Sequence, residues 1–185
     1  MVKIPGGEFK SGPDKKISNV KEFYIDKFEV PFFEFHKFDK TIEVPEGKGS
    51  HPVSEISYFA AEAYCKSLGK RLPTRLEWEK AARGDDGRKY PWGNKFDAEK
   101  ANTLEANIGN TVPISSHKNG QSPYGVMNMS GNVIEWVNEW DGPDKKYRLQ
   151  IGGSYFDNMK RSTVFSTLKS IPDDTHPYTG FRCAK

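Results

Sequence analysis

The 185-residue sequence has few cysteines, no long apolar run and almost no excess of charge. Two cysteines are too few for a disulfide-rich scaffold or for a zinc site built from four thiolates. No run of about 18 apolar residues is present, which excludes a membrane-spanning helix. Lysine and arginine number 28 against 25 aspartate and glutamate, and the net charge of +3 does not by itself indicate a nucleic-acid partner.

Aromatic residues, in contrast, are abundant at 13% of the chain, which is more than a disordered chain carries. The length fits one domain over residues 1–185, because no repeat of about 20–50 residues and no low-complexity linker divides it. The first residues, Met1 to Pro5, contain no apolar run of the signal-peptide kind. The sequence therefore leaves open whether the protein is cytoplasmic or has been trimmed of an export signal.

Three segments have the pattern of short helices. Ser57 fits the N-cap of one, and Thr74 with Glu77 forms a capping box that begins another. The third follows Pro31, with phenylalanine at every third position up to residue 38. Short strands are expected at 4–9 and 20–28. After residue 84 turn-forming pairs dominate, so we predict an α+β fold with little regular secondary structure.

Six motifs are spread over nearly the whole chain. They are IPGGEF at 4–9, GKRLPTRLEWEKAARG at 69–84, YPWGN at 90–94, YGVMNMSGNVIEW at 124–136, GGSY at 152–155 and GFRCA at 180–184. Together and in this order they resemble the formylglycine-generating enzyme family, also called the sulfatase-modifying factors. The resemblance implies the family fold, which is a loop-rich variant of the C-type-lectin fold.

The oxidases of that family use two cysteines shortly after the GGSY motif to bind copper and to convert a substrate cysteine to formylglycine. In this sequence the two positions are Asp157 and Ser162, and the segment between them contains no cysteine. Copper(I) selects soft thiolate ligands, so we expect no copper site and no formylglycine formation. The four histidines have no metal-binding spacing, so a histidine-iron site is not expected either.

Other chemistry stays open as an alternative. The candidate catalytic groups are Ser154, Asp157 and Ser162, with Asp157 as an acid–base residue if it lies in a pocket that perturbs its pKa. Fold does not determine function, so this alternative depends on the geometry of the site.

The two cysteines, Cys65 and Cys183, match a pair that is a structural disulfide in the resembled family. A bond between them would favour an extracytoplasmic protein, whereas in the cytoplasm the pair would be two buried thiols. Closing a loop of this length contributes about 4–5 kcal/mol in the chain-entropy model.

The resemblance also implies a structural calcium site. Its ligands would be the side chains of Asn128 and Glu135 and the backbone carbonyls of Gly131 and Val133, a set of hard oxygens that suits calcium. The alternative is that this loop keeps its shape by hydrogen bonds alone.

The segment 156–179 departs most from the family's enzymes and mixes aromatic with charged residues. In lectin-like folds this region forms a presented surface, and loops on a fixed scaffold are where binding specificity lies. The candidate ligand-binding residues are Tyr155, Phe156, Asp157, Asn158, Lys160, Arg161, Phe165, His176 and Tyr178. Such a mixture suits a protein or peptide partner, and the interleaved acids argue against nucleic acid.

The first hypothesis is therefore a non-catalytic binding module that uses the 156–179 face. An enzyme of the same family with cysteine-independent chemistry is the alternative, and a ligand-binding protein diversified in this segment is the second alternative. The remaining alternative for the 156–179 segment is a solvated loop without a partner. The sequence does not indicate an oligomeric state.

Overall fold

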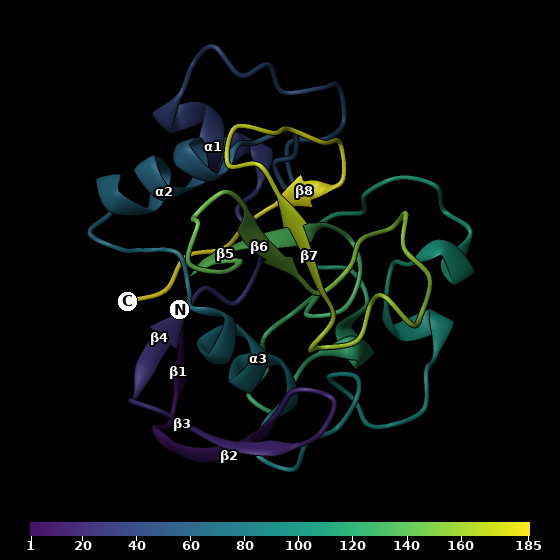
Figure 1. Cartoon of the computed structure of the whole chain (residues 1–185). Helices are drawn as coiled ribbons and strands as arrows, with labels where there is room; N and C mark the ends of the chain where they lie inside the picture. The colour runs from purple at the N-terminus through teal and green to yellow at the C-terminus, as the bar shows by residue number, and fades with distance from the viewer.

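The computed structural model describes residues 1–185 and has three α-helices and eight strands. Figure 1 shows that long loops join them. The strands are β1 (Val2–Ile4), β2 (Gly7–Ser11), β3 (Lys16–Val20), β4 (Phe23–Ile25), β5 (Ile134–Trp140), β6 (Arg148–Ile151), β7 (Thr167–Ser170) and β8 (Thr179–Gly180). The α-helices are α1 (Phe32–Phe38), α2 (Tyr58–Ser67) and α3 (Arg75–Arg83), and the 3-10 turns are η1 (Ala98–Lys100), η2 (Leu104–Ala106) and η3 (Lys118–Gly120).

The first strands form two small antiparallel ladders, in which β1 pairs with β4 and β2 pairs with β3. The strand expected over 20–28 is therefore wrong in its extent, because the chain changes ladder between Val20 and Phe23. Gly6 lies at the crossing, where a Cβ atom would come within 2.8 Å of the backbone nitrogen of Glu22. A residue without a side chain is needed for the two ladders to pass this closely.

A four-stranded sheet in the order β7-β6-β5-β8 lies at the centre of Figure 1. Its pairs are antiparallel except β5 with β8, which run parallel and bring Glu135 opposite Gly180. The helices α1 and α2 lie toward one end of the sheet, whereas α3 and the small ladders lie toward the other. The last residues of the chain therefore pass through the middle of the molecule.

The predicted helix starts at Ser57 and Thr74 are confirmed. The Ser57 side chain accepts a hydrogen bond from the Ala60 nitrogen, and Thr74 and Glu77 form both bonds of the capping box. Pro31 was predicted in the first turn of a helix, but the helix begins one residue later, at Phe32. Pro31 has extended backbone angles and occupies the N-cap.

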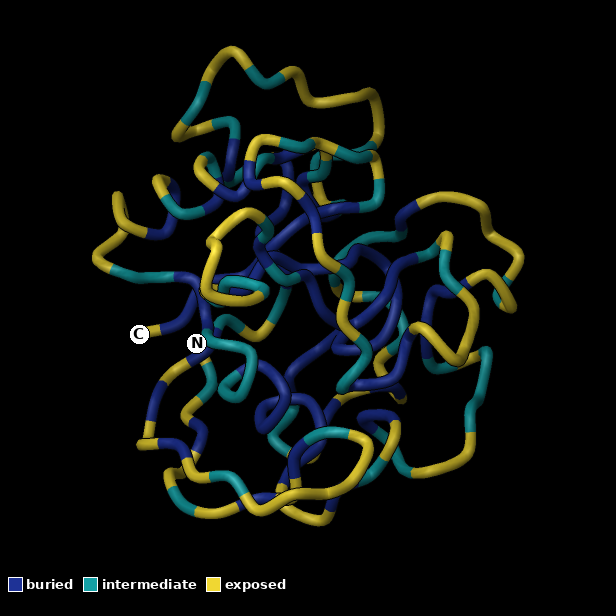
Figure 2. The backbone as a smooth tube through the Cα atoms, in the orientation of Figure 1, coloured by how far each residue is buried: buried dark blue, intermediate teal, exposed yellow.

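The apolar core has two parts. One surrounds Trp78 between α3, the small ladders and the central sheet, and the other surrounds Phe35 and Tyr64 between α1, α2 and β5. Figure 2 shows that the buried backbone lies in the middle and that the long outer loops are mostly exposed.

The structure bonds Cys65 of α2 to Cys183 near the C-terminus, with an S–S distance of 2.02 Å. Both cysteines are fully buried in the second part of the core. The bond therefore joins α2 to the segment that follows β8. None of the helices combines the length and the apolar character needed to cross a membrane.

Candidate functional site

The two positions that carry thiols in the resembled oxidases lie in a closed turn. Asp157 Oδ2 accepts hydrogen bonds from the backbone nitrogen of Ser154 at 3.0 Å and from its hydroxyl at 2.7 Å. Ser162 is buried, and its hydroxyl donates to the carbonyl of Asn158 at 3.2 Å. Gly153 makes this packing possible, because a Cβ atom there would come within 2.6 Å of the Ser162 hydroxyl. The side chains of Asp157 and Ser162 thus stabilise the backbone of the turn between residues 154 and 162.

The cavity that Asp157 itself lines is too small for a substrate. The cavity between Asp157, Arg161 and Leu168 has a volume of about 10 Å³, which is at the lower limit for a single water molecule. Ser154 is fully buried and its hydroxyl is held by Asp157 and Phe156. The pocket that the acid–base hypothesis for Asp157 requires is therefore absent here.

Three of the predicted ligand-binding residues form an aromatic column at the surface. The ring of Phe156 stacks on Tyr178 with centroids 5.9 Å apart, and Tyr178 stacks on His176 at 5.1 Å, with interplanar angles of 9° and 7°. Phe156 is 69% exposed, the highest fraction among the exposed large hydrophobic residues. The column joins the loop after GGSY to the segment before β8.

The other predicted face residues have different roles. The Asn158 side chain accepts from the backbone nitrogens of Lys160 and Arg161, so it caps their turn. Phe165 is half-buried beneath the guanidinium of Arg83, 5.2 Å from the ring centroid, and contributes to the interior. Lys160 and Arg161 themselves are exposed.

Tyr155 faces a separate cavity of about 490 Å³ next to the column. Its lining mixes polar and apolar surface and includes Glu43, Lys48, Glu55, Asn110 and Pro177. Burial, and secondarily the charge of Glu55, raise the pKa of the Tyr155 hydroxyl. The backbone nitrogen of Glu55 donates to the carbonyl of His176, so this cavity lies at the His176 end of the column.

Glu135, one of the predicted calcium ligands, takes part in a buried ion pair with Arg182. Its two oxygens accept four hydrogen bonds of 2.7–3.0 Å, three from the Arg182 guanidinium and one from Trp78 Nε1. Arg182 also donates to the backbone carbonyl of Met127 at 2.9 Å. All the acceptor capacity of this carboxylate is thus directed into the protein.

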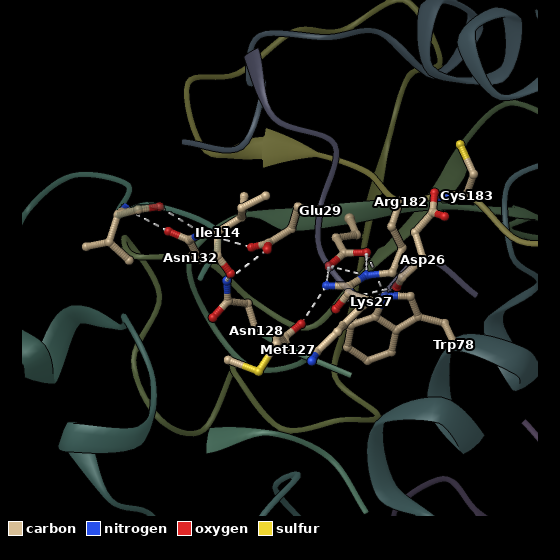
Figure 3. Close-up of polar contacts among 12 residues, drawn as sticks. Asp26, Lys27, Glu29, Trp78, Ile114, Met127, Asn128, Asn132, Arg182 and Cys183 are labelled. Atoms are coloured by element: carbon tan, nitrogen blue, oxygen red, sulfur yellow. Dashed lines mark hydrogen bonds and ion pairs between the residues drawn. The ribbon is translucent and has the colours of Figure 1, made fainter. Parts of the chain in front are cut away.

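Asn128, the second predicted side-chain ligand, turns its amide nitrogen to Glu29 Oε2 and to the carbonyl of Ile114. Asn132 donates to Glu29 Oε1 at 2.8 Å, so Glu29 is held between two asparagines (Figure 3). Burial raises the pKa of Glu29 to about 7, against the opposing effect of nearby Arg182.

These contacts bear on the calcium prediction. A calcium ion needs free oxygen lone pairs, and Glu135 offers none while it is bonded to Arg182. Freeing it would leave the Arg182 charge buried and unpaired, which is costly. In this arrangement the set of Asn128, Gly131, Val133 and Glu135 does not fit calcium. Calcium binding stays a prediction that metal analysis of the purified protein tests.

Two important residues were missed by sequence reasoning. Glu29, an acid between Phe28 and Val30, could have been noticed because a charge in an apolar run needs a partner. Leu104 carries no such signal. Its backbone nitrogen bonds the Asp157 carbonyl, which is a contact between distant parts of the chain.

Comparison with known sequences gives a match over the full length. A sequence model of the Sulfatase-modifying factor enzyme 1-like domain matches residues 1–185. The protein named "Inactive C-alpha-formylglycine-generating enzyme 2" from Bos taurus is 35% identical over 163 residues, which cover 76% of this chain and 54% of that protein. The formylglycine-generating enzyme of Thermomonospora curvata is 34% identical over 184 residues, covering 77% of this chain and 60% of the enzyme. The chain spans about half the length of the curated relatives it matches.

Comparison with solved structures supports the same fold. CarF aligns over 100% of this chain and 97% of its own, with a TM-score of 0.84 and 21% identity. Treponema denticola variable protein 1 aligns over 100% and 94%, with a TM-score of 0.84 and 19% identity. The Major Tropism Determinant P3c variant aligns over 88% and 50%, with a TM-score of 0.58 and 18% identity. The predicted α+β, C-type-lectin-like fold is confirmed.

Proposed function

Because the chain belongs to the family of sulfatase-modifying factor enzyme 1-like domains, we propose that it is a non-catalytic binding module. It binds a protein or peptide partner on the 156–179 loop face, outside the cell's reducing interior. The observation that carries the proposal is the aromatic column, in which the exposed ring of Phe156 stacks on the half-buried Tyr178 and His176. The positions that hold thiols in the oxidases lie beside it, in a turn that hydrogen bonds close.

The column has the properties of a binding anchor. An aromatic ring that other rings hold in position presents a large contact area and loses little conformational entropy on binding. Such rigid aromatic side chains provide most of the free energy in many interfaces. Exposure of the Phe156 ring to water is unfavourable, and a bound partner would remove it. A solvated loop without a partner does not explain why three rings stack at the surface.

The relatives agree with this proposal. One of them is named an inactive formylglycine-generating enzyme, so the family includes proteins without that activity. The buried Cys65–Cys183 bond supports an extracytoplasmic location, because such bonds persist in oxidising compartments.

A diversified ligand-binding protein is the second candidate. It is favoured by the fold shared with proteins named variable protein and tropism determinant variant. Sibling sequences that differ only within 156–179 would support it, and siblings that keep this segment unchanged would contradict it.

The Phe156→Ala variant tests the proposal. A random peptide library is selected on the wild-type protein, and each recovered peptide is then measured against the variant. We expect Phe156→Ala to weaken the selected peptides about tenfold or more, because the anchor ring is lost. Ile17→Ala is the matched control, since Ile17 is an exposed side chain on β3, in a different part of the fold. Peptides that bind both variants as well as the wild type would contradict the proposal.

A further inference from the structure

A cavity of about 270 Å³ lies where the loop between β4 and α1 meets the segment around η3. It shares no residue with the aromatic column or with the cavity beside Tyr155. Its lining consists of Lys27, Phe28, Ser115, Lys118, Gln121 and Met127. The proposed function makes no use of this cavity.

Every polar side chain in this lining can donate a hydrogen bond, and none is acidic. Lys27 and Lys118 are exposed, and neither belongs to an ion pair of the structure. Ser115 and Gln121 add a hydroxyl and an amide. A cleft lined by charges of one sign attracts ligands of the opposite sign, so this lining favours an anion over a cation.

Two carboxylates near the cavity are each matched by a cation of their own. Asp26, which precedes Lys27, forms an ion pair with Lys70 at 2.7 Å. Glu135 is paired with Arg182 at the same distance. Neither pair adds a net charge to the surroundings of the cavity.

Two other carboxylates have no such partner, but neither lines the cavity. Glu29 is buried, and its burial raises its pKa to about 7, so about half of it is uncharged at neutral pH. Glu99 is exposed on η1, the turn that packs against η3. Even with both of them counted against Lys27 and Lys118, the balance of charge around the cavity stays positive.

The rest of the lining is apolar. Phe28 is half-buried and Met127 is buried, and the stems of the two lysines add further methylene groups. Lys27 Nζ lies 5.5 Å from the centroid of the Phe28 ring, so a positive charge and an apolar surface lie next to each other. An inorganic anion would leave this apolar surface without a contact, whereas an organic anion covers it.

The backbone beneath the cavity is held by Arg182. Its Nη1 donates to the carbonyl of Lys27 at 3.2 Å, and its Nη2 donates to the carbonyl of Met127 at 2.9 Å. The Met127 nitrogen donates to the same Lys27 carbonyl at 2.8 Å, and Figure 3 shows these two residues side by side. Two segments of the lining are thus fixed before a ligand binds, which reduces the entropy lost on binding.

We propose that this cavity binds a small organic anion, in which one carboxylate or phosphate is attached to a compact apolar group. The anionic head pairs with Lys27 and Lys118, and the apolar group packs on Phe28 and Met127. A lysine ammonium acts as a point charge and accepts either head group. The volume is close to the lower end of the range for ligand pockets, about 300 Å³, so the ligand is small. The site is independent of the 156–179 face.

An NMR titration of the isotope-labelled full chain tests the inference with four probes. They are phenylacetate, phenyl phosphate, benzylamine and acetate. We expect the two aromatic anions to shift the amide signals of Phe28 and Met127 saturably, with a Kd of about 1 mM or lower. Benzylamine carries the wrong charge and acetate lacks the ring, so each should bind roughly tenfold more weakly. The preference for phenylacetate over benzylamine should shrink at high ionic strength.

Variants assign the binding to this cavity. K27Q/K118Q removes both charges at exposed positions, and it should weaken phenylacetate about tenfold. K145Q/K146Q is the matched control, since it removes two exposed lysines from the loop between β5 and β6 and should leave the affinity within about twofold. Phe28→Ala should reduce the preference for phenylacetate over acetate, because part of the apolar wall is lost.

Four results would overturn the inference. They are equal affinities for phenylacetate and benzylamine, no saturable shift by either aromatic anion at millimolar concentration, shifts confined to residues outside the lining, and equal weakening of phenylacetate by K27Q/K118Q and K145Q/K146Q. Tighter binding of one aromatic anion than of the other would support the site and identify its head group.

Discussion

Replacing Arg182 with methionine is expected to lower the free energy of unfolding by about 3–5 kcal/mol. The guanidinium is fully buried and donates three hydrogen bonds to Glu135, one to Met127 and weaker ones to the carbonyls of Asp26 and Lys27. Methionine fills similar volume but leaves the Glu135 carboxylate buried without a counter-charge. The measurement is equilibrium unfolding in guanidinium chloride.

Two further variants make this prediction specific. Arg161→Met removes an exposed arginine and should change stability by no more than about 0.5 kcal/mol. Arg182→Met combined with Glu135→Gln should recover part of the loss, because the buried Glu135 charge is removed as well and the amide oxygen can still accept from Trp78. A double variant less stable than Arg182→Met alone would contradict this account of the buried pair.

Removing the disulfide is the second large effect. The bond joins residues separated by 118 positions, and closing a loop of that size contributes about 4–5 kcal/mol through the unfolded chain. We expect Cys65→Ala/Cys183→Ala to lose this amount in equilibrium unfolding. Both sites are fully buried, and alanine avoids introducing a hydroxyl there.

Reduction of the wild-type protein is the control for this variant. A reductant should destabilise the wild type by a similar amount and should leave the double variant unchanged, since the variant has no bond to reduce. A loss below about 1 kcal/mol in the variant would contradict the prediction and would mean that the bond contributes little to stability.

The features that were predicted correctly are local or follow from the family resemblance. Ser57 and Thr74 cap their helices because a cap depends on atoms three residues away, which the sequence displays directly. The Cys65–Cys183 pair came from the resemblance, because spacing alone gives no partner. The limits of the strand near residue 23 were wrong, since the change of ladder depends on pairing with β1.

The site itself depends on contacts between distant segments. Glu29 meets Asn128 and Asn132 about a hundred positions away, and no periodicity indicates such a contact. The calcium prediction treated Glu135 as a free ligand because its pairing with Arg182 cannot be read from the motif. The face residues were predicted as one group, but the structure separates the stacked rings from Asn158 and Phe165, which support the backbone and the interior.

The central claim is that this scaffold binds a partner and does not oxidise a cysteine. The most direct measurement is mass spectrometry of a Cys-x-Pro-x-Arg peptide after incubation with the protein, copper and oxygen. The formylglycine-generating enzyme of Thermomonospora curvata is the positive control. We predict that the peptide is unchanged, since Asp157 and Ser162 offer copper no thiolate and are held in a closed turn. Conversion of the peptide cysteine to formylglycine would contradict the claim.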